Sequence, residues 1–153
     1  MAHKAKREGW IDEIAGFYAQ CPFISNRWLE TCDDLPSLEE NDEYFISREQ
    51  LAVLGSLYDP DGTHAGDATC WAAAASDEEL RDLPPHVISV NELDPLRDEG
   101  LQYHRRLLRA GVPTVGRVVA GTSHGGDLLL GSAMPEVFGS SIRDVSGFAH
   151  SLG

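Results

Sequence analysis

One aspartate and one histidine stand where they could work as an acid–base pair. Asp94 follows the apolar run HVISV at residues 86–90, and His124 lies in the loop GTSHGG that follows TVGRVVA at residues 114–120. Both runs are short and rich in β-branched residues, which favours buried β-strands. An aspartate that holds one ring nitrogen of a histidine leaves the other free to act as general base. The pair is therefore a candidate for the supporting half of a nucleophilic triad.

The segment between the two runs predicts one helix. Pro95 lies just inside its expected start, and Asp98 and Glu99 fall in the first turns, where negative charge suits the helix dipole. Gly111 and Pro113 end it. Its apolar face is expected at Leu101, Tyr103, Leu107 and Leu108. Because such a crossover makes the strands parallel, and neighbouring strand axes lie roughly 4.8 Å apart, the aspartate and histidine are expected within hydrogen-bond distance at one sheet edge.

Two motifs around the pair carry a family resemblance. The run NELDPLRDEG, followed by GTSHGGD, is similar to the carboxyl-terminal part of the hormone-sensitive-lipase-like family of α/β-hydrolase esterases. GFYAQCPFIS and YFISREQLAVLGSLYDPD resemble that family's region between nucleophile and acid strand, so the resemblance covers nearly the whole chain. It implies that Asp94 is the triad acid and His124 the triad base. Many members have His-Gly-Phe where this chain has His124, Gly125 and Gly126.

The resemblance also implies a fold class. The implied class is an α/β fold, specifically a partial α/β-hydrolase fold with parallel strands, crossover helices and three layers (αβα). Residues 1–153 would form the carboxyl-terminal portion of that domain. The family's HGGG-type oxyanion loop and G-D-S-A-G-like elbow precede the acid in chain order, and neither occurs in this sequence.

The function implied is that of a carboxylic-ester hydrolase acting on a small acyl ester in the complete enzyme. Because the nucleophile and the oxyanion donors are missing, we expect little or no activity from this chain alone. The alternative is a non-catalytic module of a truncated hydrolase that pairs with an amino-terminal complementing chain or a full-length relative. A homodimer is a further hypothesis.

Ser123 offers a third possibility, because residues 121–125 read G-x-S-x-G and follow a predicted strand. Were Ser123 the nucleophile of a small self-sufficient hydrolase, acid and base would have to follow it, which leaves His150 with Glu136 or Asp144. Too little chain remains for the strands that carry such residues. We therefore favour a structural role for Ser123 in a tight glycine loop.

The charge and composition of the chain exclude several kinds of binding partner. The net charge of −13 argues against nucleic acid and anionic membranes, because both repel an acidic surface. No apolar run approaches the roughly 18 residues of a membrane span, and a cytoplasmic location is the default expectation. Cys21, Cys32 and Cys70 have no C-x-x-C spacing and predict neither a disulfide framework nor a zinc site. We predict no cofactor and no metal, and expect the polar residues of the glycine-containing loop, Asp61, His64 and Asp67, to form turns.

The sequence also predicts a strand and two helices that precede Asp94 and His124 in the chain. Residues 14–21 predict a buried strand in which Gly16 allows close approach, and Ser47 with Gln50 forms a capping box for a helix at 48–57. A second capping box, Ser76 with Glu79, starts a helix at 77–83. Residues 25–46, which contain Trp28, are expected to be an acidic loop with one aromatic anchor, and Tyr44 and Phe45 are expected to be neighbours of Trp71.

The carboxyl-terminal part predicts a helical turn at 127–133 and a last helix at 136–152. Pro135 suits the start of that helix. Its apolar stripe is expected to belong to the core, and consists of Val137, Ile142, Val145, Phe148 and Ala149. Asp127 is a candidate for bracing the histidine loop.

Overall fold

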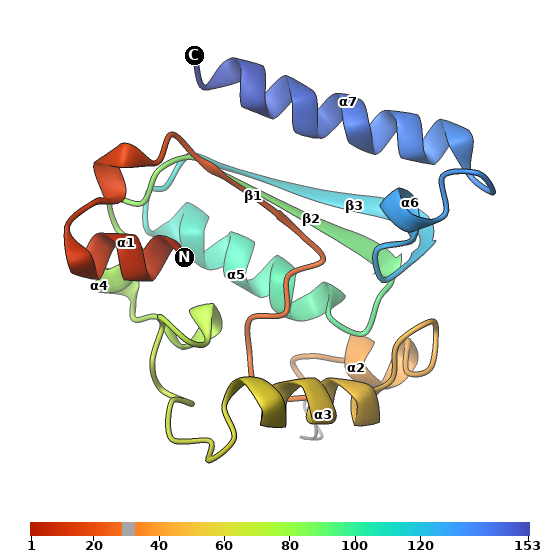
Figure 1. Ribbon diagram of the computed structural model, residues 1–153, viewed down its shortest axis with the longest axis horizontal. Coiled ribbons are helices and arrows are strands. Elements are labelled where there is room, and N and C mark those ends of the chain that lie inside the picture. Colours follow the sequence, from red (N-terminus) through yellow and green to blue (C-terminus); the bar gives the residue numbers. More distant parts are fainter. Residues whose placement is uncertain (29–32) are drawn as a thin grey trace.

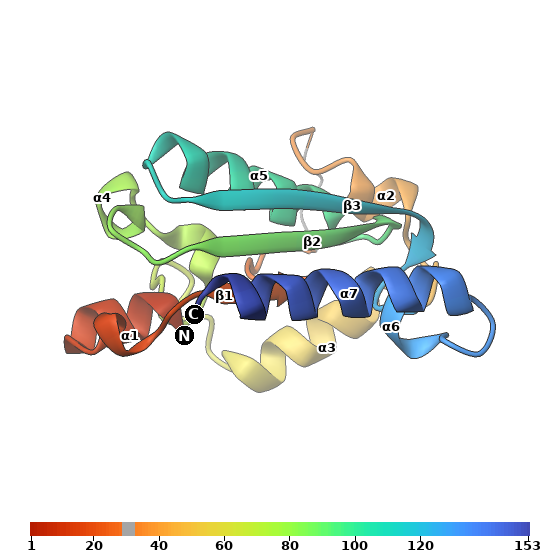
Figure 2. The same ribbon diagram turned by 90° about the horizontal axis from the view of Figure 1, so that it is seen from above.

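A parallel sheet of three strands lies between two helical layers in the computed structural model, which describes residues 1–28 and 33–153 (Figures 1 and 2). The strands are β1 (Phe17–Gln20), β2 (His86–Leu93) and β3 (Thr114–Ser123), in the order β1-β2-β3. Both pairings are parallel, with His86 opposite Phe17 on one side and Thr114 on the other. The predicted three-layer α/β class is confirmed.

The central strand β2 is buried along six consecutive residues, as expected of a parallel strand covered on both faces. The predicted β1 was too long at both ends. Residues Ile11–Glu13 form a short 3₁₀-helix (η1), and Cys21 has a φ of 44°, which turns the chain out of the strand. The close approach expected at Gly16 is confirmed, since a Cβ there would lie 2.8 Å from Phe148 and 2.9 Å from Leu152.

One face of the sheet is covered by α5 (Arg97–Arg109), with α1 (Ala2–Glu8) and α4 (Asp77–Leu80) beyond its end (Figure 1). The predicted start of α5 was wrong, because Pro95 lies before the N-cap Leu96. Leu108 was wrongly assigned to the apolar face, since it is 52% exposed. The core between α5 and the sheet includes Leu80, Leu83, Ile88, Val90, Tyr103, Leu107 and Val112.

The other face is covered in part by α7 (Pro135–Ser151), which runs along the β1 side of the sheet (Figure 2). The prediction that its apolar stripe joins the core was wrong, because Ser141 is the buried residue of this helix. Phe148 packs on Tyr18 of β1, whereas Ile142 is 45% exposed. Since α7 lies over β1 and not over the whole sheet, Val115 of β3 also remains 61% exposed.

A second core lies below the carboxyl ends of the strands, between α2 (Ser37–Glu40), α3 (Arg48–Tyr58) and the 3₁₀-helix η2 (Ala72–Ala74). The aromatic anchor Trp28 is confirmed, but Tyr44 and Phe45 are more than half exposed. Phe45 has a φ of 85°, which turns that segment outward. The rings around Trp71 are instead Phe23, Trp28 and Tyr58.

Both predicted capping boxes are present, at Ser47 with Gln50 and at Ser76 with Glu79. The helix after Ser76 ends at Leu80, earlier than predicted, because Asp82 adopts a left-handed φ of 56°. The turn predicted at 127–133 is the short helix α6 (Gly126–Leu129). In the described part of the chain, no helix combines the length and the apolar character needed to cross a membrane.

Candidate active site

The structure brings Asp94 and His124 together at the carboxyl edge of β2 and β3. His124 Nδ1 lies 2.9 Å from Asp94 Oδ2. The aspartate side chain is fully buried, and the imidazole is 27% exposed. An imidazole that donates from Nδ1 to the carboxylate keeps Nε2 unprotonated, so Nε2 is the nitrogen that could take a proton.

Local backbone geometry places each partner. Asp94 directly follows β2, and its second oxygen accepts from the N–H of Leu96 at 2.9 Å, so this residue also shapes the turn into α5. Asn41 donates to the Asp94 carbonyl at 3.2 Å. His124 follows β3 and is succeeded by Gly125, whose φ of 65° turns the chain into α6. The carboxylate is therefore a turn former and a histidine partner at once.

Asp127 connects the histidine loop to the sheet and to α7. Its carboxylate is completely buried and accepts from Gln20 at 2.9 and 3.0 Å, from Asn91 at 3.0 Å and from Ser141 at 2.6 Å. Asn91 also donates to the carbonyl of Ser123 at 2.6 Å. These contacts join β1, β2, β3 and α7 beside the imidazole, which is the arrangement expected if Asp127 braces the loop.

Cys21 is a member of this cluster that sequence reasoning missed. Its buried Sγ accepts from the N–H of Gly125 at 3.4 Å, and ligand atoms of Cys21, Asp94 and His124 all lie within 4.8 Å of one another. Burial, together with the charges of Asp94 and Asp127, raises the pKa of the thiol to about 12. A signal was present, because Cys21 ends the strand predicted to precede the acid strand, and strands in one parallel sheet end at one edge.

Comparison with known proteins decides the family. The family described as alpha/beta hydrolase fold matches residues 1–128. The chain belongs to this family. The chain also superposes on brefeldin A esterase, a bacterial homologue of human hormone-sensitive lipase, with a TM-score of 0.95 and 47% identity, covering 99% of this chain and 43% of that one. The predicted resemblance to hormone-sensitive-lipase-like esterases is thereby confirmed.

Two further esterases are similar to the chain. Esterase Est22, in a structure with p-nitrophenol, superposes with a TM-score of 0.85 and 37% identity, covering 96% of this chain and 42% of that one. Esterase LipI of Mycobacterium tuberculosis is 40% identical over 81 residues, which are 52% of this chain and 25% of LipI. The chain thus spans less than half the length of each of these relatives.

Ser123 does not lie in the arrangement that a self-sufficient hydrolase would need. It is the last residue of β3 and comes directly before the histidine, and its carbonyl is held by Asn91. The later residues considered as partners have other contacts: Asp144 accepts from the Tyr18 hydroxyl at 2.6 Å, and His150 Nδ1 lies 2.7 Å from the carbonyl of Ser146. The geometry therefore favours the structural role for Ser123.

Glu99 has a larger role in the structure than the sequence suggested. It is 5% exposed and accepts from the N–H of Ile24 at 2.8 Å and from the hydroxyl of Ser25 at 2.5 Å. The sequence assigned Glu99 to the helix dipole alone, and this assignment was wrong, because both hydrogen-bond donors come from the loop after β1. Burial raises the pKa of Glu99 to about 7. Asp98 likewise reaches a distant donor, the N–H of Ser37 at 2.7 Å.

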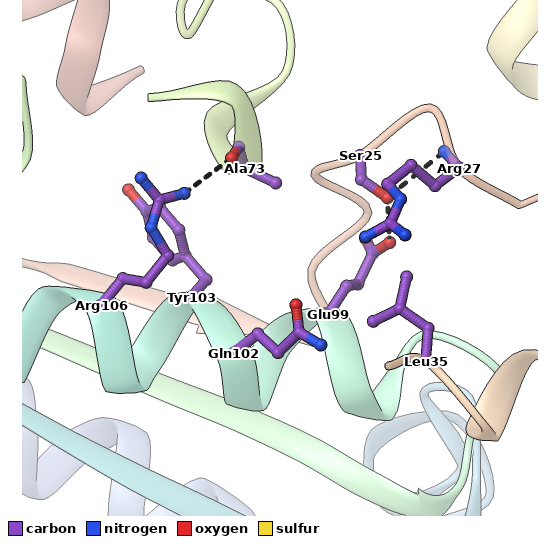
Figure 3. A pocket seen from close by; sticks show the side chains of 8 residues that line it. All are labelled: Ser25, Arg27, Leu35, Ala73, Glu99, Gln102, Tyr103 and Arg106. Atoms are coloured by element: carbon purple, nitrogen blue, oxygen red, sulfur yellow. Dashed lines mark hydrogen bonds between the residues drawn. The ribbon is translucent and has the colours of Figure 1, made fainter. Parts of the chain in front are cut away.

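A cavity of about 210 Å³ lies beside Glu99 (Figure 3). The side chains of Glu99, Gln102 and Arg106 extend from α5 toward the facing loops. Arg106 donates to the carbonyl of Ala73 at 2.8 Å and to the carbonyl of Ala75. The arginine thus closes the end of α5 against η2, and the cavity is a seam between α5 and the loops.

Two of the loop residues expected to form turns, His64 and Asp67, take separate partners. His64 Nδ1 lies 3.1 Å from Asp59, and Asp67 accepts from Arg7 at 2.8 Å and from Thr69. Cys21 and Cys70 are free thiols, whereas Cys32 lies outside the described residues.

Proposed function

We propose that residues 1–153 form the carboxyl-terminal portion of an α/β-hydrolase domain and supply the acid and the base of a carboxylic-ester hydrolase. One observation carries the proposal: the hydrogen bond between His124 Nδ1 and the fully buried Asp94 at the carboxyl edge of β2 and β3. The names of the relatives as esterases support the same reaction.

The chemistry needs a serine contributed from outside this chain. That serine attacks the acyl carbon of a small ester while His124 Nε2 takes its proton, and the resulting imidazolium returns the proton to the leaving alcohol. Asp94 holds the imidazole in the required tautomer and stabilises the imidazolium. Water then repeats the sequence on the acyl-enzyme and restores the serine.

The position of Asp94 fits this role energetically. Its carboxylate is removed from water and has the imidazole and one backbone N–H as partners. In such surroundings a positive charge that forms on the imidazole is stabilised more strongly than it would be in water. The same residues in isolation have no nucleophile to activate, so we propose that the chain alone is inactive.

The test is hydrolysis of p-nitrophenyl acetate and butyrate. The purified chain is assayed alone and mixed with the part of brefeldin A esterase that it does not cover. We expect the buffer rate from the chain alone and turnover from the mixture. His124→Ala should abolish that turnover, and the neighbouring control Ser123→Ala should retain it. Turnover by the chain alone that Ser123→Ala removes would contradict the proposal.

A second candidate is a pairing module without activity of its own. The observation in its favour is that β1 and β3 are the outer strands of the described sheet, each with one edge that carries no described strand. The partner would be an amino-terminal complementing chain or a second copy. Sedimentation is the measurement, because a monomer at tens of micromolar would eliminate the homodimer.

A further inference from the structure

The thiol of Cys21 introduces a third type of ligand atom beside the acid–base pair. The Cys21 Sγ, an Asp94 carboxylate oxygen and an imidazole nitrogen of His124 lie within 4.8 Å of one another. In the described residues this is the one group of three or more histidine, cysteine and acidic side chains close enough to hold a metal ion. Thiolate, imidazole and carboxylate are the ligands that Zn²⁺ takes in proteins.

The three ligands are held by the backbone at one sheet edge. Cys21 follows β1, Asp94 follows β2 and His124 follows β3. The N–H of Cys21 donates to the carbonyl of Ser89 at 2.8 Å, and Gly125 donates to its sulfur at 3.4 Å. Zinc bond lengths of about 2.0 to 2.3 Å put tetrahedral ligand atoms roughly 3.3 to 3.8 Å apart. The longest separation, at most 4.8 Å, must therefore contract by about 1 Å, and the 2.9 Å between His124 Nδ1 and Asp94 Oδ2 must widen by a few tenths of an ångström. Both changes are within reach of side-chain torsions.

The local charge also suits a cation. The Asp94 and Asp127 carboxylates both lie near the thiol, and the partners of Asp127 are amide and hydroxyl groups that leave its charge unneutralised. A thiolate and the Asp94 carboxylate together balance the two positive charges of Zn²⁺. A fourth ligand, such as water, would complete a tetrahedral shell.

We propose that Cys21, Asp94 and His124 bind Zn²⁺, or another thiol-preferring divalent cation, and that the bound ion inhibits the acid–base pair. Coordination displaces the thiol proton to solvent. It also takes the imidazole nitrogen that faces Asp94, so the remaining proton of the ring resides on the other nitrogen. A histidine in that state cannot accept the proton of a serine. Binding rests on the geometry alone, whereas inhibition rests on the proposed esterase function.

The experiment measures metal binding by the full 153-residue chain, without any turnover. Zn²⁺ is titrated in competition with a chromophoric chelator, and Co²⁺ is added in a parallel sample to detect the near-ultraviolet band of a thiolate-bound metal. We expect one equivalent of metal and a thiolate band. Cys21→Ser should remove the band and weaken binding by more than the roughly 10–100-fold that loss of an outer-shell partner costs.

Cys70→Ser is the matched control, because this cysteine is free and is not part of the cluster. It should keep both the stoichiometry and the band, and circular dichroism of each variant verifies that the fold is retained. Binding absent from the unmodified chain, or lost equally in both serine variants, would overturn the proposal. In the complemented esterase, micromolar Zn²⁺ should inhibit the form with Cys21 and spare Cys21→Ser. Turnover that fails altogether would count against the esterase function and leave the metal-binding result standing.

Discussion

Two buried carboxylates within the run NELDPLRDEG have different neighbours. Asp94, at the sheet edge, is paired with an imidazole that can become positively charged. Glu99, in the first turn of α5, is held by a backbone N–H and a serine hydroxyl, both neutral. Burial is similar, yet only the first region has a partner that changes charge during a reaction. The difference teaches that burial of an acid does not indicate catalysis unless its partner can exchange a proton.

Removing the charge of Asp94 gives the largest expected effect. Asp94→Asn keeps the shape but favours the wrong imidazole tautomer, so kcat of the complemented esterase should fall on the order of 10⁴-fold. Steady-state hydrolysis of p-nitrophenyl acetate measures this. Glu99→Gln in the same assay is the control and should keep most of the activity. A similar loss for both variants would remove the distinction between the two acids.

Removing the side chain of Glu99 should act on stability. Glu99→Ala leaves the Ile24 N–H and the Ser25 hydroxyl without an acceptor, and each buried unpaired group costs about 1–3 kcal/mol. Urea denaturation gives the change in the free energy of unfolding. A change below about 0.5 kcal/mol would show that water replaces the carboxylate in the adjacent cavity.

The pH dependence of the free energy of unfolding should report on Glu99. The pKa of Glu99 is about 7 in the folded chain against a reference of 4.5, so the folded state binds more protons between these values. The contribution of protonated Glu99 to the free energy of unfolding is fully present below about pH 4.5 and is lost as the pH rises through 7. The free energy of unfolding should therefore decrease by at most about 3 kcal/mol. Denaturation midpoints from pH 4.5 to 8 measure this, and Glu99→Gln should flatten the profile. If the denaturation midpoint of Glu99→Gln depends on pH as steeply as that of the unmodified chain, the pH dependence comes from other groups.

The smallest effect on stability is expected when one of the two hydrogen-bond donors to Glu99 is removed. Ser25→Ala removes the hydroxyl that Glu99 accepts from and keeps the Ile24 N–H, and should cost about 1 kcal/mol. Because that hydrogen bond lowers the pKa of Glu99, its loss should raise the pKa above 7. A carboxyl titration followed by NMR measures the shift. A fall in the pKa would mean that the variant opens the site to water.

Much of the site followed from connectivity. A strand, a crossover helix and a second strand place the residues after β2 and β3 at one edge, so Asp94 and His124 could be paired from their positions in the chain. The capping boxes at Ser47 and Ser76 were equally predictable, because donor and acceptor are three residues apart. Strand and helix ends were less accurate, as Pro95 before α5 and Cys21 after β1 show.

The sequence by itself determined the parallel direction of the strands, the helix between β2 and β3, and the meeting of acid and base. These depend on local propensity and on the geometry of a single crossover. The tertiary structure alone decided that Glu99 holds the loop at Ser25, that Asp127 joins β1 and β2 to α7, and that Cys21 lies beside the acid–base pair. Their partners are distant in the chain, and only the packing of the sheet with its helices brings such residues within hydrogen-bond distance.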